Sequence, residues 1–450
     1  MKFDLPRGMR DIDDIDSAYI DYIKEKFMEV ASLFNCRFID PSPIELLSTM
    51  EAKSGQSILN EVYGFADKGG RDVALRYDLT IGLTRWATSN RSLRLPIKLS
   101  SFGGVWRYDE PQAGRYRYFH QWDIEIYDSF TEETDAEIIE FVSLFFKNLG
   151  IKVSIDINDR RIIEEYVSYL MKKYNVVFDD TEGPEILDEM FRTIDKIPKK
   201  GKQQAYDEYM TNYKKKFTAF IDPLLVQDIF NLCSNRVHIS EINKIPELKN
   251  LKNIHILLRI IESLKSRGIY DEIFLNLGIV RGLDYYSGLV FEVNDTVSKD
   301  VGSIVGGGRY DKLPEIFGRG DLGAVGAAGG IERIIHSLKN NKIDLDTHSQ
   351  KKDLIYVTYV LKDLKKSSIE IVSLLRRHKI RVDYDILDRS FKKQLEDASI
   401  KDSKLVLIMG PNEFSQGKVL IKDMSTGNET QVDISSLVSY LQTESDLVNI

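Results

Sequence analysis

Three short arginine-containing segments with glycine in or near them constrain this chain of 450 residues more than any other feature. They lie far apart along the chain, at residues 107–111, 281–288 and 326–333, and contribute Arg107, Arg281 and Arg333. A guanidinium is a planar fork of donors that matches phosphate or carboxylate oxygens. Nearby glycines leave room for a close backbone approach or a bound ring. We therefore expect a fold that gathers these segments around one anionic reaction centre.

Length and composition indicate the broad class of protein. The chain is long enough for two domains or more, and its 42% apolar content suffices for full-sized cores. No apolar run is long enough to cross a bilayer, and residues 1–16 resemble neither a signal nor a transit peptide. The two cysteines are far apart, so neither a disulfide framework nor a cysteine zinc site is expected. We expect a multidomain cytoplasmic protein without a membrane partner.

Residues 1–338 are expected to form one domain of helices and strands. Apolar residues at helical spacing predict amphipathic helices over 17–34 and 135–149. Strand signals occur over 98–107 and 121–127, joined by a long loop, so we expect these two strands to pair in antiparallel order. Further strands are expected over 37–39, 153–157, 273–280, 290–293 and 324–328.

The remaining sequence predicts an insertion, a linker and a second domain. Residues 171–264 are rich in lysine with helical spacing of tyrosines, which indicates an inserted helical subdomain. The polar stretch 339–352 is expected to be a linker. Strand and helix signals alternate over 353–450, which predicts an α/β domain with a mainly parallel sheet. The net charge of −8 argues against indiscriminate nucleic-acid coating, but this last part is nearly balanced and is a candidate RNA-facing module.

The familiar nucleotide and metal signatures do not explain the chain. No Walker-type phosphate loop occurs. A dinucleotide-like glycine pattern at 318–323 follows no hydrophobic strand, so we interpret it as a loop unrelated to dinucleotides. The six histidines show no metal-ligand spacing, and no protein-bound metal site is predicted.

A site that holds phosphates with arginine side chains on a sheet remains. Arg107 closes one predicted strand and Arg115 lies in the following loop, so both can project over the same sheet face. Phe119 lies on the returning strand, where an adenine can stack, and Arg333 begins a helix after a strand of small residues. A lone arginine is more often part of a surface ion pair. Three arginines flanked by glycines favour a shared phosphate site instead.

These segments resemble the motifs of the histidyl-tRNA synthetases, a family of class II aminoacyl-tRNA synthetases, over essentially the whole chain. Residues 5–11 resemble the family's N-terminal signature, and the strand at Pro43 resembles the first class motif, which builds a homodimer interface in the family. The second and third class motifs are resembled by 107–125 and 326–333. Residues 281–288 and 306–311 resemble the two histidine-specific motifs, and the C-terminal α/β unit resembles the anticodon-binding domain.

The resemblance implies a fold, a reaction and partners. The fold is an α+β catalytic domain on an antiparallel sheet, with a helical insertion and a C-terminal α/β domain. The reaction activates L-histidine with ATP to histidyl-adenylate and transfers it to the 3′ end of tRNA(His), and Mg²⁺ neutralises the departing pyrophosphate. A homodimer is implied as well.

The resemblance also implies individual roles. Arg107 grips the ATP α-phosphate and Arg115 the outer phosphates, while Phe119 and Arg333 sandwich adenine. The residues implied to contact histidine or its reacting carboxylate are Asp78, Thr80, Gln121, Glu125, Arg281, Tyr285, Tyr286 and Tyr310. The implied catalytic residues among these are Arg107, Arg281 and Gln121. Asp78 and Asp109 depart from the pattern, since glutamate is common in relatives at both positions, and the shorter acids change the reach of the charge.

Two alternatives use the same fold differently. A non-catalytic paralogue serves as the regulatory subunit of ATP phosphoribosyltransferase, but it usually lacks the C-terminal domain and an arginine at the position of Arg281. A histidine-binding sensor fused to a kinase is the second alternative. No kinase signature is present to support it.

Overall fold

The chain forms two compact units, Met1–Asp344 and Leu345–Ile450. The computed structural model describes residues 4–54, 56–108, 110, 116–128, 130–178, 182–217, 219–280, 286–343 and 354–443. Helix α12 (Ile331–Asn340) continues past the predicted start of the linker at Lys339. None of the described helices is long and apolar enough to span a membrane.

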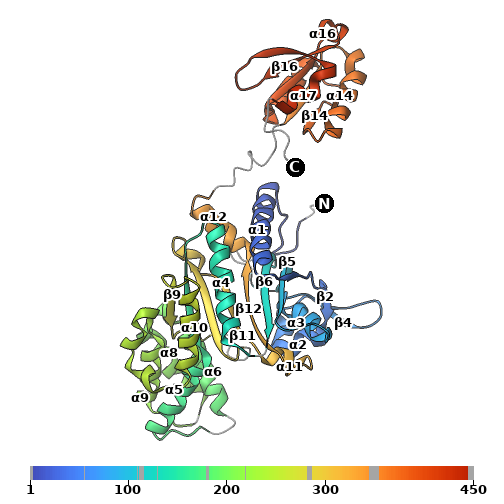
Figure 1. The fold of residues 1–450 in the computed structure, drawn as a ribbon. Helices are drawn as coiled ribbons and strands as arrows, with labels where there is room; N and C mark the ends of the chain where they lie inside the picture. Colours follow the sequence, from blue (N-terminus) through green and yellow to red (C-terminus); the bar gives the residue numbers. More distant parts are fainter. Residues whose placement is uncertain are drawn as a thin grey trace. The chain divides into compact units, whose positions relative to one another are not determined.

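A nine-stranded sheet is the frame of the described part of the first unit (Figure 1). In spatial order its strands are β1 (Arg37–Phe38), β5 (Ile97–Trp106), β6 (Tyr118–Asp128), β12 (Gly323–Gly330), β11 (Ser303–Arg309), β10 (Leu289–Asp295), β7 (Val153–Asp159), β9 (Ile273–Asn276) and β8 (Arg236–His238). The pairs β1–β5 and β7–β9 are parallel, and the other neighbouring strands pair antiparallel. The predicted antiparallel sheet is therefore a mixed sheet with an antiparallel centre.

One face of this sheet is covered by helices. Helices α1 (Asp14–Leu33), α4 (Glu132–Asn148) and α12 pack together on its central strands (Figure 1). Trp122 of β6 faces them, because its ring lies 5.6 Å from Phe27 of α1 and 5.2 Å from Phe145 of α4 between centroids. Successive side chains of a strand point to opposite faces. The side chains that flank Trp122 therefore point to the other face of the sheet.

The helical insertion lies beyond β7 and includes the edge strand β8. Its helices are α5 (Arg160–Lys173), α6 (Glu182–Ile194), α7 (Ile197–Lys200), α8 (Lys202–Lys216), α9 (Pro223–Cys233) and α10 (Ile254–Ser266), with 3₁₀ turns η2 (Ile239–Lys244) and η3 (Pro246–Asn250). Tyr209 of α8 is buried, and its ring lies 5.9 Å from both Tyr213 and Phe230. Two of the periodic tyrosines of this segment, Tyr209 and Tyr213, thus belong to its core.

A second, small sheet is absent from the prediction. It contains β2 (Ile44–Leu46), β4 (Asp72–Leu75) and β3 (Gly64–Ala66), all antiparallel. The helical elements α2 (Leu47–Ser54), η1 (Gln56–Asn60) and α3 (Thr80–Ser89) follow strands of this small sheet in the chain. Two further short elements, η4 (Lys299–Val301) and α11 (Lys312–Ile316), follow strands of the large sheet. Residues 317–322 connect α11 to β12, and Gly323 begins β12, so the dinucleotide-like glycines follow a helix and no hydrophobic strand, as predicted.

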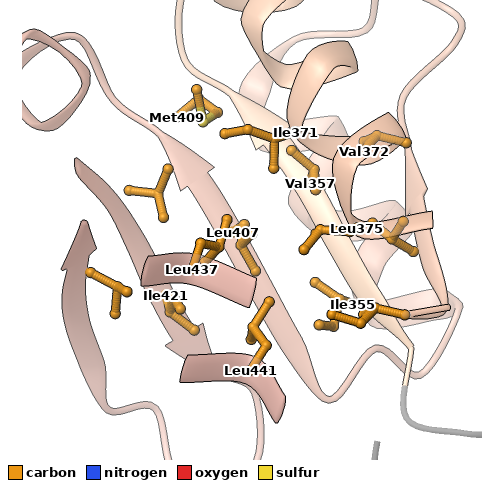
Figure 2. Close-up of a cluster of buried hydrophobic side chains, with 14 of the residues drawn as sticks. Ile355, Val357, Ile371, Val372, Leu375, Leu407, Met409, Ile421, Leu437 and Leu441 are labelled. Carbon is orange, nitrogen blue, oxygen red and sulfur yellow. The ribbon is translucent and has the colours of Figure 1, made fainter. Parts of the chain in front are cut away.

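The second unit has a five-stranded sheet, and side chains from these strands and from two helices form the apolar cluster drawn in Figure 2. The strand order is β14 (Val382–Tyr384), β13 (Ile355–Tyr359), β15 (Leu405–Met409), β16 (Lys418–Asp423) and β17 (Glu429–Asp433). The helical elements are η5 (Lys362–Leu364), α14 (Lys365–Arg377), α15 (Phe391–Ile400), α16 (Pro411–Ser415), η6 (Ile434–Ser436) and α17 (Leu437–Thr443). Leu437 and Leu441 of α17 pack into the same cluster as Leu407 of β15 (Figure 2).

The sheet predicted as mainly parallel in this unit is mixed, with two parallel and two antiparallel strand pairs among the described residues. The pairs β13–β14 and β13–β15 are parallel, but β15–β16 and β16–β17 are antiparallel. A short turn joins β16 to β17, with Gly427 at φ 76°, and a connection that short can join only antiparallel neighbours.

Candidate active site

A cavity of about 450 Å³ is lined by side chains on the sheet face opposite Trp122, among them Gln121, and by Glu332 and Arg333 from the first turn of α12. Its lining contains many of the residues singled out from the sequence: Asp78, Thr80, Arg107, Phe119, Gln121, Tyr286, Tyr310 and Arg333. The cavity therefore collects side chains from the second class motif, both histidine-motif segments and the third class motif. Arg115, Arg281 and Tyr285 lie outside the described residues, as does Asp109.

Arg107 is held in a defined orientation at the end of β5. Its Nε donates to the backbone oxygen of Tyr77 at 3.2 Å, and its Nη2 donates to Oε1 of Gln121 at 3.1 Å. The guanidinium also lies over the rings of Tyr77 and Phe119, at 4.5 and 5.1 Å from their centroids. A guanidinium carries five N–H donors in a rigid fork, so fixing two of them fixes the direction of the others. Arg107 is thus a preorganised cation in the cavity wall.

Glu125 is buried behind two residues that line the cavity, Tyr310 and Gly326, and does not line it itself. It is almost fully buried, and the hydroxyl of Tyr310 donates to its carboxylate. Gly326 on the neighbouring strand β12 pairs with Glu125 in the sheet, and a Cβ at Gly326 would lie 1.6 Å from the Glu125 Oε2. The absence of a side chain at 326 is therefore what allows the carboxylate to occupy this place.

Acidic groups surround Tyr286, the first described residue after the 281–285 segment. Burial, followed by the charges of Glu125, Glu292, Asp78 and Asp123, raises the pKa of Tyr286 well above its usual value. The phenol therefore stays protonated at neutral pH and can donate a hydrogen bond. The cavity is lined by the carboxylates Asp78 and Glu292 and by the cations Arg107 and Arg333, and so suits a substrate that carries both signs of charge.

Asp78 is fixed by the start of helix α3. Its Oδ1 accepts from the backbone N–H of Ile81 at 3.1 Å, and Thr80 is the first residue of the helix. A carboxylate at a helix N-terminus is stabilised by the free N–H groups and the helix dipole. Both predicted ammonium ligands, Asp78 and Thr80, are thus placed by one helix end.

A buried ion cluster supports the histidine-motif residues from below. The Arg309 guanidinium contacts Asp135 at 2.9 Å, Asp311 at 3.2 Å and Asp128 at 3.3 Å. Asp311 in turn accepts from the Ser287 hydroxyl at 2.9 Å. Burial raises the pKa of Asp135 to about 7, whereas Arg309, against the effect of burial, lowers the pKa of Asp128.

The sequence analysis missed two buried side chains: Arg309, which belongs to this ion cluster, and Asp123, which lies next to the cavity. Arg309 stands inside the glycine-dense segment 306–311, so its position was signalled although its role was not. Asp123 lies between Gln121 and Glu125 on β6 and accepts hydrogen bonds from Gln121 and Thr80. Alternation along the strand places these three acidic or amide side chains on one face, and that pattern could have identified Asp123.

Protein ligands for a metal ion are not gathered anywhere in the described ranges: no group of three or more His, Cys, Asp and Glu residues there could hold one. The cysteines are poor nucleophiles. Burial raises the pKa of the Cys36 and Cys233 thiols to about 12 in each case.

Comparison with known proteins matches both units. Residues 8–334 match the family model described as histidyl-tRNA synthetase, and residues 354–444 match that of the anticodon binding domain. The histidine–tRNA ligase of Pyrococcus horikoshii is 33% identical over 442 residues, covering 97% of this chain and 98% of the relative. That of Thermoplasma volcanium is 32% identical over 450 residues, covering 98% and 99%. The crystal structure of histidyl-tRNA synthetase from Nostoc sp. PCC 7120 shares the fold, with a TM-score of 0.76 at 21% identity, covering 99% of this chain and 100% of the other.

Proposed function

The chain belongs to the histidyl-tRNA synthetase family and acts as a histidine–tRNA ligase, and from this premise we propose which residues perform each part of the reaction. The observation that carries the proposal is the single cavity lined by Arg107, Tyr286, Tyr310 and Arg333, which come from separate motifs. In the first step, a carboxylate oxygen of histidine attacks the α-phosphorus of ATP, and pyrophosphate leaves. In the second, a terminal ribose hydroxyl of tRNA attacks the carbonyl carbon of the adenylate, and AMP leaves.

Arg107 stabilises the charge that develops in the first step. The five-coordinate phosphorus places more negative charge on its oxygens than the ground state does, and a fixed guanidinium favours the state with more charge. The stacking and hydrogen bonds of Arg107 support this role, because they fix its direction before the substrates bind. Gln121 lies beside the reacting carboxylate. On the resemblance, Arg281 contacts the α-phosphate from the opposite side.

The acidic part of the cavity selects histidine. Glu125 accepts a hydrogen bond from the imidazole, with Tyr310 and Tyr286 beside it, while Asp78 and Thr80 receive the α-ammonium group. An amino acid without an imidazole would leave the buried carboxylate and phenols unpaired, and unpaired buried groups are costly. On the resemblance, Tyr285 lines the same pocket.

ATP is bound through its base and its phosphates. We propose that adenine lies between Phe119 and Arg333, where Arg333 is steadied by donating to the backbone oxygen of Ser303 at 2.5 Å. Arg115 would contact the outer phosphates. Mg²⁺ would enter as part of MgATP, held mainly by the phosphate oxygens, and would neutralise pyrophosphate as it leaves.

The second unit binds tRNA through the domain that matches the anticodon-binding family, with tRNA(His) as the expected partner. Cells load tRNA where proteins are made, so we place the activity in the cytoplasm. The regulatory paralogue of ATP phosphoribosyltransferase is less well supported, since the curated relatives that match over nearly the full length are histidine–tRNA ligases.

We propose that the active form is a homodimer that pairs through the small sheet. Leu46 of β2 and Phe65 of β3 both pair with Val73 of β4, so their side chains share one face of the sheet. Ile44, two residues from Leu46, lies on the same face, and these three side chains are 44–48% exposed. An apolar face of this kind is typical of a protein interface. We assign a second copy of the chain to it because β2 directly follows Pro43, where the sequence resembles the motif that builds the homodimer interface in the family.

Sedimentation velocity tests the dimer. At micromolar concentration we expect a species of twice the chain mass, and we expect Leu46→Asp to shift it to the monomer by placing a charge in the apolar contact. Leu224→Asp, an exposed leucine on α9, is the matched control and should leave the dimer intact. A monomeric wild-type chain, or a Leu46→Asp variant that still dimerises, would remove this interface from the proposal.

The assigned reaction is tested by ATP–pyrophosphate exchange with each standard amino acid in turn. We expect exchange with histidine alone, followed by charging of tRNA(His) in a second assay. Exchange with another amino acid would contradict the assignment of the pocket. Histidine binding without exchange or charging would favour the regulatory paralogue.

A further inference from the structure

Asp123 is a fully buried carboxylate that lies next to the cavity without lining it. It occupies β6 between Gln121 and Glu125, and alternation along the strand directs all three side chains to the cavity face of the sheet. The burial of an acidic group without a function in the fold would be unfavourable. The hydrogen bonds of Asp123 therefore indicate what this buried carboxylate does.

Two cavity-lining side chains donate to Asp123. The hydroxyl of Thr80 donates to Oδ2 at 3.0 Å, and Nε2 of Gln121 donates to Oδ1 at 2.7 Å. At its other end, Gln121 accepts from Nη2 of Arg107 at 3.1 Å. An ionised carboxylate only accepts and a guanidinium only donates, so the amide between them has one satisfactory orientation. A continuous set of directed hydrogen bonds thus runs from Thr80 through Asp123 and Gln121 to Arg107.

We propose that Asp123 is a positioning residue that sets the hydrogen-bond direction of both Thr80 and Gln121. This proposal rests on the proposed function, in which those two side chains contact the substrate. Because the Thr80 proton points to Asp123, the hydroxyl lone pairs are available to the α-ammonium group of histidine. The carboxylate adds negative charge behind that group. Asp123 therefore acts on histidine through Thr80 and on the reacting carboxylate through Gln121.

The variant Asp123→Asn changes the direction of these bonds at almost constant volume. The asparagine offers one acceptor oxygen and one NH₂ donor, so it cannot accept from both Thr80 and Gln121. If Gln121 keeps the oxygen, the NH₂ group faces Thr80, and the Thr80 hydroxyl must accept from it. The Thr80 proton then turns towards the cavity and opposes the substrate ammonium group. The loss should fall on histidine binding more than on ATP binding.

Steady-state exchange kinetics test this on the full chain. For Asp123→Asn we expect the KM for histidine to rise by about tenfold or more, since a hydrogen bond to a charged group is lost. The KM for ATP and the melting temperature should change little. Combining Asp123→Asn with Thr80→Val should raise the KM for histidine by less than the product of the single effects, because both variants remove one shared interaction.

Asp295→Asn is the matched control. Asp295 is also a buried carboxylate that accepts from a hydroxyl, that of Ser337 at 2.7 Å, and a side-chain amide, that of Asn341 at 2.8 Å. It accepts in addition from the backbone N–H of Val297 at 2.8 Å, and it does not line the cavity. Its variant should lose at least as much stability as Asp123→Asn and leave the KM for histidine unchanged. Equal KM effects of the two variants, or an unchanged KM in Asp123→Asn, would overturn the positioning role. Absence of histidine-dependent exchange in the wild-type chain would instead overturn the proposed function.

Discussion

Replacing Arg107 with alanine is expected to slow histidyl-adenylate formation by about 10²- to 10³-fold, which corresponds to roughly 3–4 kcal/mol of lost transition-state stabilisation. The guanidinium is preorganised by Tyr77, Phe119 and Gln121, so its interaction with the developing phosphorane charge requires no rearrangement during the reaction. The effect should appear in kcat of the exchange reaction and in the single-turnover rate. The KM for histidine should change less, because the proposed imidazole contacts are with Glu125 and Tyr310.

Two further variants separate charge from geometry. Arg107→Lys keeps the positive charge but loses the planar fork and the stacking, so it should recover only part of the lost rate. Arg376→Ala is a control of similar chemistry, because Arg376 stacks on Tyr384 and donates to the backbone oxygen of Val382 in the second unit. It should leave exchange unchanged, since exchange requires no tRNA. A near-normal rate for Arg107→Ala would exclude Arg107 from the reaction centre.

The parts of the fold that were predictable have strong local signals. Strand β6 alternates apolar side chains towards the helices with polar ones towards the cavity, and helix α4 carries a continuous apolar stripe, so both were predicted close to their observed bounds. The small sheet was missed because each of its strands is only three or four residues long. Strand β17 was missed because Glu429, Thr430 and Gln431 are all exposed and carry no apolar alternation.

The site could be predicted only where the type of a single side chain indicates what it binds. Arginines beside glycines indicated a phosphate site, and the cavity does contain Arg107 and Arg333. The supporting bonds were beyond local reasoning, because Thr80 and Asp123 are 43 residues apart and Arg309 and Asp135 are 174 apart. Such pairs are created by strand order and register, which periodicity along the chain does not reveal. The motif residues could therefore be identified from the sequence, whereas the buried carboxylates that hold them in place could not.

Adding one methyl group at Gly326 is expected to lower kcat/KM for histidine by roughly 10²-fold, because it removes a hydrogen bond to a charged group and misplaces its partner. The new Cβ would lie 1.6 Å from the Glu125 Oε2 and 2.8 Å from the Ile124 backbone oxygen. The second contact is with backbone, so rotation of Glu125 alone cannot relieve the crowding. Gly326→Ala must therefore move the carboxylate away from the imidazole position, shift β12 against β6, or both.

Exchange kinetics, the KM for ATP and the melting temperature together identify the cause of the loss. Glu125→Gln removes the charge at nearly constant volume, so it should reproduce the histidine defect without the strain. Gly320→Ala is the control for a tolerated methyl group, since its Cβ would meet the Cγ of Glu315 at 3.6 Å, an ordinary van der Waals contact. If Gly326→Ala loses stability while Glu125→Gln keeps a normal kcat/KM for histidine, Glu125 does not read the imidazole. If both variants fail with histidine while the KM for ATP is preserved, the carboxylate below Tyr310 is the group that recognises the amino acid.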